Sequence, residues 1–226
     1  MLGWGGLLLL VLLGPASAMR FTLPKLAPED AAQIKRLAVV SVLGDKLRIA
    51  KAGVIVFQNK SFDVPVPDWG LDAHIRSYMQ ERIVASGRIN GNVESLVVPK
   101  SDKLVILDLA RQHGFDAVIG AMPEGGPPPQ GQFVSYSPAV LFWGGMGPYA
   151  CDGMAIYIWR VSDGKEIGLS HPIQCNFSRP LDGVTWHSSW SEFTETEKQK
   201  CVESVQNFVE EQVVLAFADQ KLQPRQ

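Results

Sequence analysis

The sequence lacks an excess of charge of either sign, and its charged residues form no runs. Among 226 residues, 21 are Lys or Arg and 23 are Asp or Glu, a formal net charge of -2. Proteins that bind nucleic acid carry clustered positive charge, so we expect no nucleic-acid partner. With 46% hydrophobic and 19% charged residues, the composition is typical of a globular protein of one or two domains.

The amino-terminal region also lacks an apolar run long enough to span a bilayer. Residues 7–13 are unbroken and apolar, but they are too few for a transmembrane helix. Ala16-Ser17-Ala18 follows as a cleavage signal, so the pattern predicts a secretory signal peptide over residues 1–18 and a periplasmic or secreted protein. No Lys or Arg precedes the apolar run, which leaves an uncleaved amino-terminal anchor as the alternative.

Cysteine is scarce, with three residues in the chain. None directly follows the cleavage point, so attachment through a lipidated amino-terminal cysteine is not supported. Cys151 and Cys175 flank two apolar runs that meet at Asp163-Gly164, a hairpin turn signal. A two-residue turn places Cys151 opposite Asn176, whereas a bulge or a three-residue turn places it opposite Cys175. Because exported proteins retain disulfides, we predict a Cys151–Cys175 disulfide and a buried, inert Cys201.

Apolar periodicity predicts an α/β (α+β) fold, a mixed sheet of about six strands with three helices in a single layered domain over residues 34–220. An extended lead-in, 19–33, precedes this domain, and a short tail, 221–226, follows it. The expected strands are 34–43, 53–57 with an extension at 62–66, 93–98, 115–121 and the two strands of the hairpin. The expected helices begin near Asp68–Leu71, at Ser101 and after a capping box at Thr194-x-x-Glu197, and Gly87 and Gly114 end the first two.

Two segments, IKRLAVVSVL (34–43) and KLVILDLARQHGFDAVIGA (103–121), together with the helix that ends at Gly87 and the final hairpin and helix, resemble small domains of the bacterial cell envelope. Such domains include the amino-terminal domain of the Tol-Pal translocation protein, the periplasmic domain of the curli secretion lipoprotein and the outer-membrane activator of penicillin-binding proteins. The resemblance covers most of residues 34–218 and implies an α/β domain that acts by binding partners, with no catalytic residues to carry over. The lipidation cysteine of the lipoprotein members is absent, and the 125–150 insertion has no counterpart in them.

The sequence contains no complete catalytic motif among those we considered. No G-x-S-x-G elbow accompanies His187, and Gly144–Gly147 lacks the Lys-Ser/Thr that a phosphate loop requires. We therefore predict no catalytic residues, no metal and no cofactor. The alternative is a secreted hydrolase or metal-binding enzyme that uses His171, His187 and Glu192, with the paired cysteines as further zinc ligands.

The insertion at residues 125–150 is too broken by glycine and proline for a helix and too apolar for a linker. Leaving it in water would cost roughly 1.5–3 kcal/mol for each large side chain left unburied, so its own domain, a partner or a ligand must cover it. The first hairpin strand, 154–159, is apolar on both faces, so we expect helices on one face and another layer or a partner on the other.

The leading hypothesis is a non-enzymatic, exported cell-envelope protein that binds a protein partner or self-associates through this insertion, with peripheral membrane contact as a further use of the same surface. A small-ligand carrier with the insertion as its lid is another reading. Deletion of residues 130–147 is then expected to leave the fold intact. The residues assigned to the binding surface are Phe133, Tyr136, Leu141, Phe142, Trp143, Met146 and Tyr149.

Overall fold

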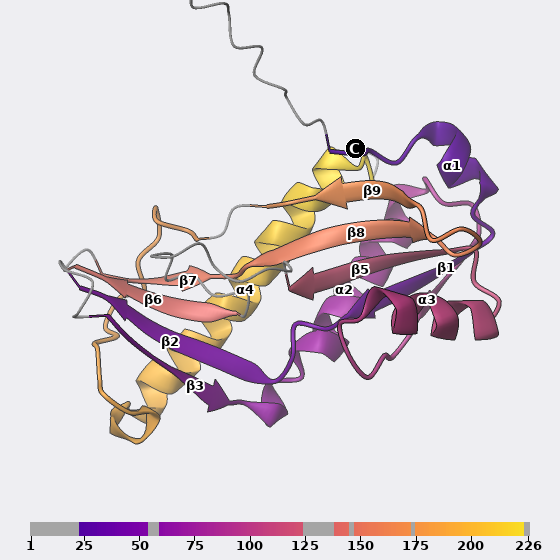
Figure 1. Ribbon diagram of the computed structural model, residues 1–226. Coiled ribbons are helices and arrows are strands. Elements are labelled where there is room, and N and C mark those ends of the chain that lie inside the picture. The colour runs from indigo at the N-terminus through magenta and orange to yellow at the C-terminus, as the bar shows by residue number, and fades with distance from the viewer. Residues whose placement is uncertain (1–22, 54–58, 124–137, 145–146, 173–174, 224–226) are drawn as a thin grey trace, which may run out of the picture.

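The computed structural model describes residues 23–53, 59–123, 138–144, 147–172 and 175–223, which form two mixed sheets with helices packed on them (Figure 1). The α+β class is as predicted, but the described strands form a five-stranded sheet, β4-β1-β5-β8-β9, and a four-stranded sheet, β3-β2-β6-β7, instead of one sheet of about six strands. The strands are β1 (Arg36–Ser41), β2 (Lys46–Ala52), β3 (Lys60–Pro65), β4 (Asn92–Ser95), β5 (Ala117–Pro123), β6 (Ala139–Trp143), β7 (Pro148–Cys151), β8 (Met154–Arg160) and β9 (Glu166–Ser170).

The helices begin and end at the residues that their local signals predict, with two differences. They are α1 (Pro28–Gln33), α2 (Leu71–Ser86), α3 (Lys103–Gln112) and α4 (Glu195–Asp219). Gly87, at a φ of 59°, ends α2, and the capping box of Thr194 and Glu197 begins α4, as expected. Asp102 caps α3 in place of the expected Ser101, because its carboxylate accepts the free N–H groups of the first turn. The lead-in, expected to be extended, contains the short helix α1.

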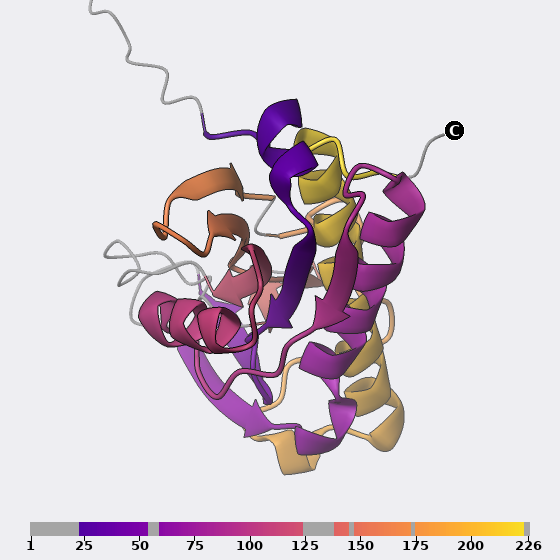
Figure 2. The same cartoon turned by 90° about the vertical axis from the view of Figure 1, so that its right-hand side faces the viewer.

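The five-stranded sheet is covered on both faces by helices of the same chain. Figure 2 shows α3 on one side of the sheet and α2 and α4 on the other. In β8, Ile156 and Ile158 belong to the core cluster on the α2 and α4 side, whereas Trp159 belongs to the cluster beneath α3. The doubly apolar strand therefore needs no partner chain, since α3 is the second layer.

The four-stranded sheet contains strands that the sequence patterns did not indicate. β2 (Lys46–Ala52) lies before the expected strand at 53–57, of which residues 54–57 fall outside the described residues. β6 and β7 form an antiparallel pair within the 125–150 insertion, which was expected to be a loop. Because β6 lies between β2 and β7, deleting 130–147 would remove an interior strand, so we now expect that deletion to disrupt the four-stranded sheet instead of leaving the fold intact.

The long helix α4 joins the two sheets into one core, because it crosses behind both of them (Figure 1). Residues along α4 share one hydrophobic cluster with strands of both sheets, and the two phenylalanines among them, Phe208 and Phe217, are 4% and 1% exposed. The lead-in is fixed to the end of α4, where the Gln220 side chain accepts a hydrogen bond from the Leu26 N–H and donates to the Leu169 carbonyl. Within the described ranges, no helix is long and apolar enough to cross a membrane; the predicted signal peptide, 1–18, lies outside them.

Candidate functional site

The strands β6 and β7 carry the described part of the predicted binding surface. Phe133, Tyr136 and Met146 lie outside the described residues. Three of the others are buried within the chain, with exposed fractions of 3% for Leu141, 7% for Phe142 and 5% for Tyr149. Trp143 is 44% exposed, so it is the described member of the set that offers surface to a partner.

Alternation along β6 separates Phe142 from its neighbours. The Phe142 ring belongs to the core cluster shared with α4, and in the segment before α4 it contacts Trp186 at 5.4 Å and Phe193 at 6.4 Å between ring centroids. Leu141 and Tyr149 belong to a separate cluster on the other face of the sheet, together with the cysteine pair. Because successive side chains of a strand point to opposite faces, β6 and β7 place described residues of the insertion in two buried clusters of the protein itself.

The predicted disulfide between Cys151 and Cys175 is present. A register shift between Ile158 and Trp159 in the β8–β9 hairpin changes the pairing by one residue. The shift sets Cys151 directly opposite Cys175. This is the pairing expected from the sequence for a hairpin with a bulge or a three-residue turn. Disulfides persist in oxidising compartments, so the bond is consistent with an exported protein.

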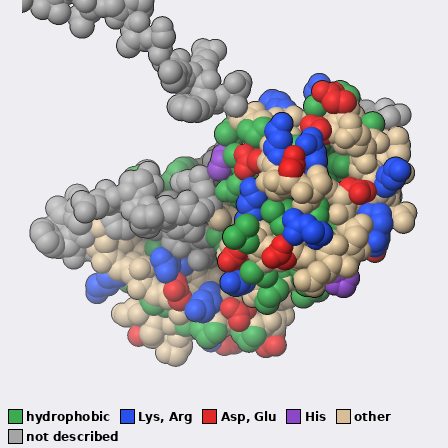
Figure 3. Space-filling model, turned by 45° about the vertical axis from the view of Figure 1, so that its right-hand side comes forward, with side chains coloured by type: hydrophobic (Ala, Val, Ile, Leu, Met, Phe, Trp, Pro, Cys, Tyr) green, Lys and Arg blue, Asp and Glu red, His purple; other side chains and the backbone are tan. Residues whose placement is uncertain are grey.

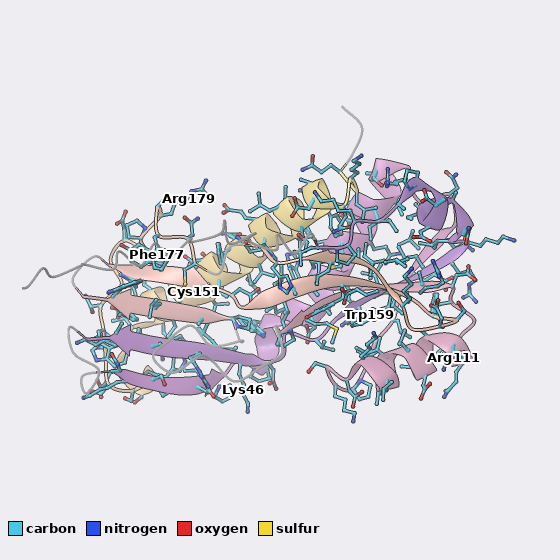
Figure 4. All side chains as sticks on the ribbon, turned by 45° about the horizontal axis from the view of Figure 1, so that its top comes forward. Lys46, Arg111, Cys151, Trp159, Phe177 and Arg179 are labelled. Atoms are coloured by element: carbon cyan, nitrogen blue, oxygen red, sulfur yellow. A yellow bond between two sulfur atoms is a disulfide. The ribbon has the colours of Figure 1, made fainter. Side chains whose placement is uncertain are left out.

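The disulfide brings an aromatic side chain that the sequence patterns had not indicated, Phe177, onto the four-stranded sheet. Its ring lies 5.3 Å from the ring of Trp143 and 5.3 Å from that of Tyr149, edge-on to both. Phe177 is 49% exposed. We call the pair Trp143 and Phe177 the aromatic rim, and Figure 4 shows its Phe177 beside Cys151, at the end of the molecule remote from Arg111 on α3.

The segment after Cys175 is held firmly along the outer edge of β7. The Asn176 N–H donates to the Ala150 carbonyl, and the Leu181 N–H donates to the Pro148 carbonyl. Arg179 forms an ion pair with Glu211 of α4. This segment and α4 border a groove of about 650 Å³, lined mainly by polar and charged side chains. The segment that carries Phe177 is therefore fixed to β7 and to α4.

His187 and Glu192 do not form the hydrolytic arrangement considered from the sequence. Glu192 accepts hydrogen bonds from the Ser188 N–H and the Ser189 hydroxyl. The Nε2 atom of His187 lies 3.3 Å from Glu197, beneath the first turn of α4. His171 follows β9 of the other sheet, where its ring contacts that of Tyr157. Within the described ranges, no group of three His, Cys, Asp or Glu residues is placed to hold a metal ion.

Glu197 closes the loop before α4. Its carboxylate accepts hydrogen bonds from the N–H groups of Thr194 at 2.9 Å and Thr185 at 3.0 Å, and from both hydroxyls. These donors, the backbone of Thr194 first, lower the pKa of Glu197 to about 2. A carboxylate with this many donors stabilises loop structure and is a weak base, so it is poorly suited to general base catalysis.

Asp152 is a buried carboxyl group at the crossing from β7 of one sheet to β8 of the other. It is 2% exposed, and neither carboxyl oxygen has a hydrogen-bond partner among the described residues. Desolvation raises the pKa of Asp152 to about 7. No sequence signal indicated this burial, because an Asp-Gly pair is ordinarily a turn at the surface.

Comparisons with known proteins assign no family to this chain. No family model matches it, and no curated protein matches it. Two solved structures of the PelC dodecamer from Paraburkholderia phytofirmans are similar, at 13% and 15% identity. The alignments cover 89% and 91% of this chain and 95% and 96% of those chains, each with a TM-score of 0.36. Similarity at that level carries no argument about this protein.

Proposed function

We propose that this chain is an exported, non-enzymatic protein of the cell envelope, periplasmic or secreted, that binds a protein partner through the aromatic rim. The observation that carries the proposal is the pair of rings Trp143 and Phe177, 44% and 49% exposed and packed edge-on at 5.3 Å. Aromatic side chains with a rigid setting are the anchors that contribute most to protein–protein affinity. Trp143 comes from the 125–150 insertion, so this proposal narrows the surface predicted from the sequence to its exposed part.

Other exposed apolar side chains support the choice of this site, because none of them takes part in a ring contact like that of Trp143 and Phe177. Leu104 and Val97 are 72% and 70% exposed, but no ring contact or disulfide organises them. On the face drawn in Figure 3, hydrophobic side chains are interspersed with Lys, Arg, Asp and Glu. Single exposed apolar residues are ordinary in globular proteins, whereas a paired and braced aromatic surface is typical of a binding site.

Co-purification of the tagged, exported protein with its envelope partner tests the proposal. Trp143→Ala and Phe177→Ala are expected to abolish capture of the protein that the wild type retains. Leu215→Ala is the matched control, since Leu215 is 45% exposed on α4 and lies outside the rim. Equal capture by the rim variants and the control would show that the rim is not the binding surface.

A further inference from the structure

β3 is the outermost strand at one edge of the four-stranded sheet, next to β2. The Val66 N–H donates to the Asp45 carbonyl, which fixes the direction of the backbone groups along this antiparallel pair. Alternate residues of such a pair point their N–H and C=O groups to opposite sides. The backbone groups of Ser61 and Asp63 therefore point away from the sheet.

Within the described residues, β2 is the one strand hydrogen-bonded to β3, and no other segment makes a backbone hydrogen bond to Ser61 or Asp63. Ser61 and Asp63 are both exposed. Figure 4 shows this edge beside the label of Lys46, across the sheet from Phe177. Pro65 ends the free edge, because proline has no N–H to donate. An open edge of this kind is a template for a short strand of another chain.

We propose that β3 pairs in antiparallel orientation with β3 of a second copy of this chain, about a two-fold axis. Outward backbone groups must meet outward groups, so Ser61 of each copy lies opposite Asp63 of the other and exchanges both hydrogen bonds with it. A shift by two residues would set Asp63 opposite Asp63 and Ser61 opposite the donor-less Pro65. The register with Phe62 on the axis avoids both the like-charge pair and the missing donor.

The side chains of β3 complement one another in that register. The Ser61 hydroxyl meets the Asp63 carboxylate of the other copy. The charge of Asp63 is already balanced within its own chain, since Arg48 donates to its two oxygens at 2.7 Å and 3.0 Å. Phe62 is half-buried against Trp186, 6.0 Å away between ring centroids. Phe62 of the second copy would extend this contact across the axis as a cross-strand aromatic pair.

This dimer goes beyond the proposed function and uses the opposite edge of the same sheet. The strand order β3-β2-β6-β7 places the aromatic rim away from the dimer axis, so the joined sheet would carry one rim at each far end. Two rims on one rigid body would bind a partner with repeated sites more tightly than one rim does, without any new contact.

Cysteine cross-linking of the full exported chain tests the register. Phe62→Cys places two cysteines directly opposite each other in a non-hydrogen-bonded pair, with Cα atoms about 4.5 Å apart, within disulfide range. Ser61→Cys is the matched control, because its cysteines would lie diagonally apart on the other face of the sheet. We expect mild oxidation to convert Phe62→Cys largely to a covalent dimer and to leave Ser61→Cys monomeric on non-reducing gels.

Sedimentation of the unmodified chain supplies the second readout. The wild type is expected to show twice the monomer mass, and Ser61→Pro, which removes an outward N–H that β2 does not use, is expected to sediment as a monomer with unchanged circular dichroism. A monomeric wild type, or equal cross-linking of the two cysteine variants, would overturn the proposal. Dimerisation that survives Ser61→Pro but is lost in Trp143→Ala would overturn it too and would assign self-association to the rim. Capture of the envelope partner by Ser61→Pro reports on the proposed function separately.

Discussion

Phe177 packs edge-on against Trp143, with their ring centroids 5.3 Å apart. Trp143 ends β6, and Phe177 follows the cysteine that is bonded to the end of β7. The disulfide therefore fixes the chain two residues before the second ring, and hydrogen bonds to β7 hold the segment that follows. Both rings are about half exposed, so the chain presents an aromatic surface that its own core does not use.

Neighbouring residues of β6 are expected to respond differently to truncation. Phe142→Ala removes a ring buried against Trp186 and Phe193 and is expected to lower the free energy of unfolding by about 3–5 kcal/mol. Trp143→Ala is expected to lower it by about 0.5 kcal/mol or less, because its ring faces solvent. Urea denaturation of both variants measures the difference. Equal losses would mean that Trp143 is a structural residue.

Removal of the disulfide is expected to destabilise the protein and loosen the rim. Cys151 and Cys175 are separated by 24 positions. A disulfide across a loop of that length lowers the entropy of the unfolded chain, so its removal is expected to lower the free energy of unfolding by about 3 kcal/mol. Urea denaturation of the Cys151→Ser, Cys175→Ser double variant measures this loss. The tryptophan fluorescence of the folded variant is expected to shift, since Phe177 is released from Trp143. An unchanged spectrum would show that hydrogen bonds to β7 suffice to hold Phe177.

Asp152 is expected to make stability depend on pH near neutrality. Its pKa is raised from 3.8 to about 7, so the folded state keeps a proton that the unfolded state loses between these values. Stability therefore falls as the pH rises from about 4 to about 7, by at most about 4 kcal/mol, and is constant above that. Asp152→Asn removes this loss, so we expect a higher melting temperature than the wild type at pH 8 and convergence toward pH 4. If the difference in melting temperature between the two proteins is the same at every pH in this range, the pKa of Asp152 is not raised in the folded state.

Glu197 is expected to have the opposite dependence. Its pKa is lowered from 4.5 to about 2, so its stabilising effect is present above about pH 4.5 and is lost as the pH falls toward 2. Glu197→Gln is expected to melt at a lower temperature than the wild type at pH 7, and the gap should close in acid. Glu195→Gln is the control, because that side chain is 89% exposed in the same helix turn. If both variants melt alike at pH 7, the loop before α4 does not depend on Glu197.

Local patterns were sufficient for the limits of α2 and α4 and for most of the disulfide pairing, but not for α1 or for the cap of α3. Gly87 at the end of α2 and the Thr194–Glu197 capping box before α4 act on neighbouring backbone groups. Their effect can therefore be predicted from a few consecutive residues. The Asp163-Gly164 turn placed the two cysteines within one residue of facing each other, and the bulge in the hairpin supplied the rest.

The strands of the four-stranded sheet were harder to predict because their pairing is long-range. β6 and β7 are short and lie among glycines and prolines, which locally favour turns. Burial against β2 and α4 outweighs those preferences in the folded chain. The same applies to Phe177, whose role depends on residues far from it along the chain.

The sequence by itself determined the α+β class, the limits of α2 and α4, and that Cys151 and Cys175 lie within one residue of facing each other, because each follows from periodicity or from groups close together in the chain. Only the tertiary structure decided that the strands divide into two sheets, that Phe142 turns inward while Trp143 stays in solvent, and that Asp152 is buried between the sheets. Those outcomes depend on which surfaces pack together when the chain folds. The free energy of that packing comes from contacts between residues far apart in the sequence, which no local pattern connects.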